Sequence, residues 1–162
     1  MMNKPQNPTY MKRSAFLVVV FGLFGTVSLQ AQELIPYRKG DKMGFCTPDK
    51  KVVIQPKYHW ANPFSEGLAE VKLNGKWGFI DKTGREVVPL KYDGAGEFSE
   101  GLARVKLNGK YGFIDKTGRE VVPPKYVLVL GFGEGLAGVM LNGNTFYIKV
   151  FPDGKVVEYY DE

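Results

Sequence analysis

The residue types that carry most enzyme chemistry are scarce in this chain. Its only histidine is His59, and no serine or cysteine nucleophile shares its neighbourhood in the sequence. Two acids, Glu66 and Glu100, recur at equivalent positions, and a pair of carboxylates can hydrolyse a glycan. Such an enzyme keeps its two carboxyls in different environments, whereas duplicated positions supply equivalent ones. We therefore expect no catalytic residue, no metal site and no cofactor, and we expect that the protein is not an enzyme.

Aromatic residues, 14% of the chain, are the second group able to contact a ligand. Their recurrence first suggests packing between repeated units. Trp77 and Tyr111 also carry polar groups and, in the strand register expected below, lie opposite Lys72 and Lys106. There they could line an exposed groove that stacks on sugar rings or on a peptide. These two aromatic residues are the candidate ligand contacts.

The elements that must position these residues are repeats. Residues 64–92 return as residues 98–126 at an offset of 34, with 26 of 29 positions identical. The pattern continues in degenerate form on both sides, which predicts a repeat domain over residues 40–162 with units of about 40–63, 64–97, 98–131 and 132–162. Residues 32–39 are expected to form a short linker, so that the first unit lacks a leading strand. A unit of this size cannot bury an apolar face alone, and neighbouring units must pack on each other.

Each inner unit reads as a three-stranded β-meander. Apolar and polar residues alternate, and the glycines and proline of each unit argue against a helical repeat. The expected strands of one unit cover residues 67–73, 76–81 and 85–88, and Pro89 should end the third because it has no backbone N–H. The expected fold class is all-β: tandem antiparallel meanders of period 34, stacked as an open array because the units are too few for closure.

The turns supply the structural repeat positions. Asn-Gly joins the first two strands of a unit as a type I′ turn, and a later glycine takes the left-handed position of a bulge. The Asn-Gly turn places Val71 opposite Gly78, where the missing side chain lets an aromatic ring or another backbone come close. If the units stack in register, Glu70 and Arg104 are expected to pair. The structural positions are Asn74, Gly75, Gly78, Gly84, Asn108, Gly109, Gly112 and Gly118.

These residues resemble the bacterial WG repeat, whose units read roughly Glu-Gly-Leu-Ala, then Asn-Gly-Lys-Trp-Gly-Phe-Ile-Asp, then Gly and a short apolar strand. The resemblance covers about Gly40 to the C-terminus, with the name dipeptide at Trp77-Gly78, variants at residues 43–44 and 111–112, and a departure at Thr145. It implies an all-β repeat domain that is frequent in exported bacterial proteins and generally has no assigned activity.

The N-terminal segment predicts export. Basic residues precede an apolar run of about 15 residues that ends at Ala31, and roughly 20 residues are needed to span a bilayer. Residues 1–31 are therefore expected to be a signal peptide, with initiation at Met11 as an alternative start. Retention of the segment as an uncleaved anchor is the other interpretation. The expected location is periplasmic, extracellular or cell-surface, in a bacterium, with no membrane span after cleavage.

Charge and cysteine content exclude other classes. Removing residues 1–31 lowers the formal net charge from +5 to +2, because that segment holds three basic residues and no acid. The remaining basic residues are spread among acids, so we expect no nucleic-acid partner. The lone Cys46 cannot form an internal disulfide, and it stands where later units have Ile80 and Ile114, which predicts a buried apolar role.

Three functions remain open from the sequence. The leading hypothesis is an exported, non-catalytic repeat module that contacts a protein or an envelope polysaccharide. A small secreted glycan hydrolase using Glu66 or Glu100 is the first alternative. A structural spacer or self-assembling unit, whose exposed end strands pair with another chain, is the second.

Overall fold

The computed structural model describes residues 33–151 and 153–159, which lie in one compact unit, Ala31–Glu162. All regular elements in this part are β-strands, and it holds no helix long and apolar enough to cross a membrane. The strands are β1 (Ile35–Lys39), β2 (Lys42–Cys46), β3 (Val52–Tyr58), β4 (Trp60–Ala61), β5 (Leu68–Leu73), β6 (Lys76–Asp81), β7 (Glu86–Tyr92), β8 (Gly94–Ala95), β9 (Leu102–Leu107), β10 (Lys110–Asp115), β11 (Glu120–Tyr126), β12 (Leu128–Gly133), β13 (Leu136–Leu141), β14 (Asn144–Val150) and β15 (Val156–Tyr159).

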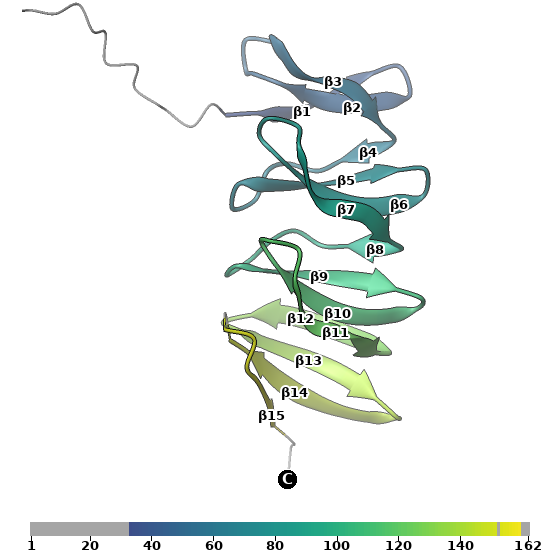
Figure 1. The fold of residues 1–162 in the computed structure, drawn as a ribbon, viewed down its shortest axis with the longest axis vertical. Helices are drawn as coiled ribbons and strands as arrows, with labels where there is room; N and C mark the ends of the chain where they lie inside the picture. Colours follow the sequence, from purple (N-terminus) through teal and green to yellow (C-terminus); the bar gives the residue numbers. More distant parts are fainter. Residues whose placement is uncertain (1–32, 152, 160–162) are drawn as a thin grey trace, which may run out of the picture. The chain divides into compact units, whose positions relative to one another are not determined.

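The strands form four antiparallel sheets that follow one another in chain order (Figure 1). The first sheet has the order β1-β2-β3, and the other three have the orders β4-β5-β6-β7, β8-β9-β10-β11 and β12-β13-β14-β15. The last sheet does not return to the first. The all-β open array of stacked meanders that the repeats predict is therefore confirmed.

The Asn-Gly turns set the register of the β5-β6, β9-β10 and β13-β14 hairpins as expected. Asn74 and Gly75 have φ angles of 50° and 80°, the left-handed values that a type I′ turn requires at both central positions. β5 and β6 then pair Val71 with Gly78, together with the flanking pairs Leu73↔Lys76, Lys72↔Trp77 and Glu70↔Phe79. Asn108 and Gly109 repeat this geometry one unit later. The hairpin and its register could thus be derived from two residues.

The second turn is held by an aspartate. Asp81 Oδ1 accepts hydrogen bonds from the N–H and hydroxyl of Thr83 and from the N–H of Arg85, while Gly84 has a φ of 85°. These bonds, the Thr83 hydroxyl first, lower the pKa of Asp81 to about 2.

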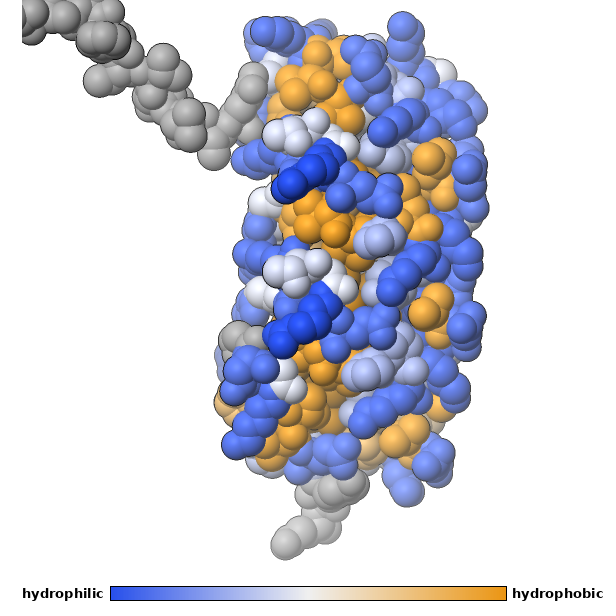
Figure 2. All heavy atoms as spheres, viewed as in Figure 1, coloured by the Kyte–Doolittle hydropathy of each residue, from blue (hydrophilic) through white to orange (hydrophobic). Residues whose placement is uncertain are grey.

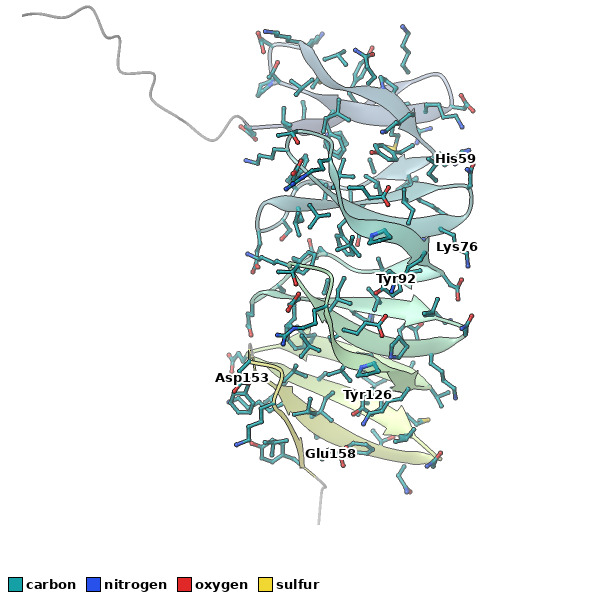
Figure 3. All side chains as sticks on the ribbon, viewed as in Figure 1. His59, Lys76, Tyr92, Tyr126, Asp153 and Glu158 are labelled. Atoms are coloured by element: carbon teal, nitrogen blue, oxygen red, sulfur yellow. The ribbon has the colours of Figure 1, made fainter. Side chains whose placement is uncertain are left out.

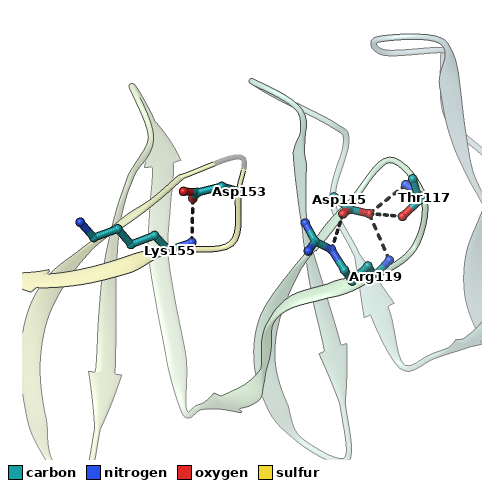
Figure 4. A network of polar contacts seen from close by, with 5 residues as sticks. All are labelled: Asp115, Thr117, Arg119, Asp153 and Lys155. Carbon is teal, nitrogen blue, oxygen red and sulfur yellow. Dashed lines mark hydrogen bonds and ion pairs between the residues drawn. The ribbon is translucent and has the colours of Figure 1, made fainter.

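Figure 4 shows the same turn one unit later and its counterpart in the last unit. Asp115 accepts from Thr117 and Arg119. Burial alone would raise the pKa of Asp115, but the bonds from Thr117 and Arg119 bring it down to about 2. In the last unit Asp153 accepts from the N–H of Lys155 at 2.9 Å.

Gly78 lies where the backbone of the third strand crosses the second. A Cβ built on Gly78 would come within 2.5 Å of the carbonyl oxygen of Val88 and 2.9 Å of the backbone nitrogen of Leu90. β6 and β7 pair Trp77 with Tyr92 and Phe79 with Val88, so three residues of β7 bulge out opposite one residue of β6. The close approach expected at this glycine is therefore made by backbone.

This bulge corrects the expected end of the third strand. β7 continues through Pro89 to Tyr92. Pro89 is tolerated because it sits in the bulge of an edge strand, where its missing N–H breaks no ladder bond.

The glycine contact recurs in three sheets and is lost in the fourth. Added Cβ atoms on Gly44 and Gly112 would likewise collide with the backbone of β3 and β11. In the last sheet Phe146 stands at this position, and β14 and β15 pair in regular register from Tyr147↔Tyr159 to Val150↔Val156. The third strand is thus bulged in the three sheets that have glycine at this position and regular in the sheet that has phenylalanine there.

Two further expectations about strands were wrong. The stretch expected as a linker contains β1, so the first unit does have a leading strand. The strand was missed because Pro36 argues against a strand in the sequence. The proline is tolerated because β1 is an edge strand. Each inner unit was expected to form a sheet of three strands, yet β4, β8 and β12 each add a fourth strand to the sheet that follows.

The core lies between sheets. Three phenylalanine pairs join consecutive units: Phe45–Phe64 and Phe79–Phe98 have ring centroids 4.8 Å apart, and Phe113–Phe132 has centroids 5.3 Å apart. The predicted role of the recurring phenylalanines in the inter-unit core is confirmed. Cys46 is buried as a free thiol, as expected from its equivalence to Ile80.

We predict that Gly78→Ala lowers the free energy of unfolding by more than about 2 kcal/mol, because the added methyl group must push the β7 backbone away. Gly96→Ala is the matched control, since its nearest atom would be 3.9 Å away, and it should change stability by less than about 0.5 kcal/mol. Urea unfolding followed by circular dichroism measures both. Equal costs for the two variants would contradict the backbone contact.

We also predict acid sensitivity from the two aspartate turns. Their folded pKa values of about 2 lie below the ordinary value of 3.8, so the unfolded chain binds protons more readily. The stabilisation is complete above about pH 5 and is lost progressively as the pH falls through 3.8 towards about 2. Asp81→Asn/Asp115→Asn should therefore be less stable than the wild type at pH 7 and lose less stability between pH 4 and pH 2.5. An unchanged slope in urea unfolding would contradict this assignment.

Candidate functional site

Two tryptophans and a lysine form a row across the second sheet. β4 pairs Trp60 with Lys72, and β6 pairs Trp77 with the same lysine, so the three side chains share one face of the sheet. Lys72 Nζ lies 5.5 Å from the centroid of the Trp77 ring, and Trp60 is 46% exposed. The row presents two indole surfaces with a cation between them.

The buried carboxyl of Glu70 holds the Trp60 side chain in place through Asn62. The indole N–H of Trp60 donates to Asn62 Oδ1 at 2.7 Å, and the amide of Asn62 donates to Glu70 Oε1. Glu70 is buried, and that burial raises the pKa of its carboxyl. The expected pairing of Glu70 with Arg104 is not a direct contact, because Glu70 takes Asn62 as its partner and Arg104 Nη1 donates to the carbonyl of Val129 at 3.3 Å. The charge of Arg104 still acts on Glu70 and opposes the rise in its pKa.

The row lines a groove of about 520 Å³, whose walls are His59, Trp60, Lys72, Gly75 and Trp77. His59 lies at the edge of the stack beside the hairpin ends (Figure 3). Its Nδ1 accepts the backbone N–H of Asn74 at 3.2 Å, so His59 helps to hold the end of the hairpin. One unit later Asp93 takes this place and accepts from the N–H of Asn108 at 2.7 Å.

Tyr111, the other candidate contact, lies in a different environment. Its ring is flanked by Lys106 Nζ at 5.0 Å and by the Arg104 guanidinium at 5.6 Å. The hollow beside it is only about 130 Å³, and Gly94 stands there in place of Trp60. Trp77 and Tyr111 thus line separate hollows and do not form one site.

The groove is specific to one unit. Its supporting residues Trp60, Asn62 and Glu70 become Gly94, Gly96 and Arg104 one unit later, then Leu128, Leu130 and Gly138. The sequence predicted Trp77 and Lys72 as neighbours but missed Trp60. The available signal was that all three supporting positions differ together while most positions around them are repeated.

The repeated glutamates link consecutive units. Glu66 has a φ of 50°, and its Oε2 accepts from the N–H of Gly101 at 3.0 Å and lies 2.9 Å from Lys116 Nζ. The hydrogen bond from Lys116 is the main reason that the pKa of Glu66 is lowered. Glu100 repeats the link to the N–H of Glu134 at 2.7 Å. Both carboxylates therefore hold the stack together.

Metal binding has no candidate site in the described residues, where no three side chains among His, Cys, Asp and Glu are grouped to hold an ion.

Comparison with protein families finds a match along most of the chain. Residues 43–77, 77–111 and 111–144 each match the family model described as WG containing repeat. Neither the curated proteins nor the solved structures gave a match to this chain.

The two tryptophans allow a direct test of the groove, because the chain has no others. In Trp77→Phe, the remaining Trp60 is nearly half exposed, whereas in Trp60→Phe the remaining Trp77 is half-buried beside Lys72. Acrylamide should therefore quench the fluorescence of Trp60 more strongly than that of Trp77. Equal quenching, or stronger quenching of Trp77, would contradict the geometry of the row.

Proposed function

The chain belongs to the family of WG containing repeats, and on that premise we propose that it is an exported, non-catalytic repeat module that binds an acidic envelope polysaccharide in the groove between Trp60 and Trp77. The repeat scaffold supplies a rigid surface, and the residues specific to the second unit supply the contacts.

The row of Trp60, Lys72 and Trp77 carries this proposal. Indole faces stack on sugar rings, and the places of the two tryptophans on β4 and β6, on either side of Lys72 in β5, fix them without a flexible loop. The ammonium between them favours a sugar that bears a carboxylate or another anion. The bond from Trp60 through Asn62 to Glu70 holds the more exposed indole in place before a ligand arrives, which lowers the entropy lost on binding.

The absence of catalysis is supported by the roles of the repeated acids. A general acid needs a raised pKa, whereas Lys116 and a backbone N–H lower that of Glu66. Glu100 accepts a backbone N–H of the following unit. A hydrolase built on these two residues would have to break the links between units.

Export is proposed from the sequence of residues 1–31, which lie outside the described residues. Their basic start, short apolar run and small residue at Ala31 are typical of a signal peptide. A periplasmic, extracellular or cell-surface location would bring the groove to envelope polysaccharides.

We predict that the unit Ala31–Glu162 binds oligomers of galacturonic acid and that neutral maltodextrins of equal length bind more weakly. Trp60→Ala and Trp77→Ala should each raise the dissociation constant at least about tenfold, equivalent to about 1.4 kcal/mol. Lys72→Met should remove the preference for the acidic oligomer while leaving weak binding to both. Isothermal titration calorimetry measures these effects.

Tyr111→Ala is the matched control, because it changes the equivalent position one unit later and should leave binding unchanged. An equal loss in this control, or no binding of either oligomer by the wild type, would overturn the proposal. Hydrolysis of an oligomer that stops in Glu66→Gln would favour the hydrolase instead.

A further inference from the structure

The free face of the last sheet is apolar where the same face of earlier sheets is covered. Directly opposite residues of β13 and β14, Gly138 and Tyr147, correspond to Glu70 and Phe79 in the second sheet. Phe79 is fully buried against Phe98 of the following unit, whereas Tyr147 is 47% exposed. This face, which we call the tail face, consists of Leu130, Leu136, Gly138, Tyr147 and Tyr159.

The position of Leu136 gives the same contrast. Its equivalents Leu68 and Leu102 are 8% and 3% exposed, whereas Leu136 is 39% exposed. A hollow of about 290 Å³ lies on the tail face between Leu130, Leu136 and Tyr147. In the earlier sheets the next sheet covers this surface, whereas in the last sheet the same surface is exposed.

The substitutions at positions 130 and 138 make this face less polar, which is the reverse of a solvent-facing cap, whereas position 147 exchanges phenylalanine for tyrosine. A repeat that ends an array against water is expected to carry a polar outer face. Here Leu130, 64% exposed, stands where earlier units have Asn62 and Gly96, and Gly138 stands where they have Glu70 and Arg104. Loss of a charge and gain of an exposed leucine point to a partner.

The opposite end of the array offers the matching surface. Ile35 and Tyr37 of β1 correspond to Ala103 and Val105, which are buried in the cluster that covers Phe79. Ile35 is 39% exposed and Tyr37 is half-buried. The first sheet therefore bares apolar residues at the positions that, inside the stack, cover the preceding sheet.

Charge favours the same pairing. Residues 33–58 hold six Lys or Arg against three Asp or Glu, a formal +3, and residues 127–162 hold two against five, a formal −3. Opposite net charges on the two end units favour their encounter, while the orientation follows from the apolar positions that already meet in this way inside the stack. We propose that the tail face binds the first sheet of a second copy of this chain, so that copies stack head to tail and extend the repeat array.

The proposal predicts an open association. A head-to-tail contact that does not close extends into a chain of copies, so the mean mass in sedimentation velocity should rise with concentration. Gly138→Arg blocks the tail face with the residue that position 104 already carries, and its Cβ would meet its nearest atom, of Leu130, at an ordinary 3.4 Å. Ile35→Glu blocks the first sheet with a charge that the acidic tail unit repels. Each variant alone should raise the dissociation constant at least about tenfold.

Mixing the two variants gives the decisive result. The free first sheet of Gly138→Arg and the free tail face of Ile35→Glu should combine into a one-to-one dimer that does not grow. Val127→Asp is the control, because it removes an apolar side chain that is 47% exposed in the same unit and installs the residue of position 93. It should associate as the wild type does, and thermal unfolding verifies that every variant is folded.

Three results would overturn the proposal. The wild type could stay monomeric at all concentrations. Ile35→Glu could associate as strongly as the wild type, which would indicate tail-to-tail contact. Val127→Asp could lose association to the same extent as Gly138→Arg, which would show that the tail face is not the contact.

Discussion

The structure depends on the close approach of two backbones at one glycine in each of three sheets. Gly44, Gly78 and Gly112 have no Cβ, and the third strand of each sheet bulges into the space that a side chain would fill. The bulge brings a tyrosine, Tyr92 in the second sheet, back into pairing with the residue before the glycine and buries it. Where Phe146 replaces the glycine, the third strand runs straight. The glycine thus separates the regular inner units from the last one.

Packing between units and ligand contact use different positions of the same scaffold. Phenylalanine pairs and the Glu66 and Glu100 links recur from unit to unit, and they fix how one sheet lies on the next. Figure 2 shows hydrophobic patches between hydrophilic side chains along the face of the stack in view. Positions 60, 62 and 70 vary as a set, which lets one unit carry an aromatic groove without disturbing its neighbours.

Most of the fold was accessible from the sequence because local chemistry determines it. The Asn-Gly turns fix the hairpin register, the Asp-x-Thr-Gly turns fix the next connection, and the repeat shows that the units stack. Strands with a weak local signal were missed: β1 carries Pro36, and β4 has only two residues, whose pairing comes from β5. Trp77 and Lys72 followed from the register, whereas Trp60 depended on that unpredicted strand. The bulge through Pro89 required knowledge of which strand lies at the edge of the sheet.

Distances across the bulge test the glycine constraint most directly. In a nuclear Overhauser spectrum of the labelled protein, the α protons of Gly78 should show strong cross-peaks to the amide proton of Leu90, and those of Gly112 should show them to the δ protons of Pro124. Across β14 and β15 the pattern should instead be that of a regular antiparallel ladder. A regular ladder between β6 and β7, with Gly78 opposite a single residue of β7, would contradict the account.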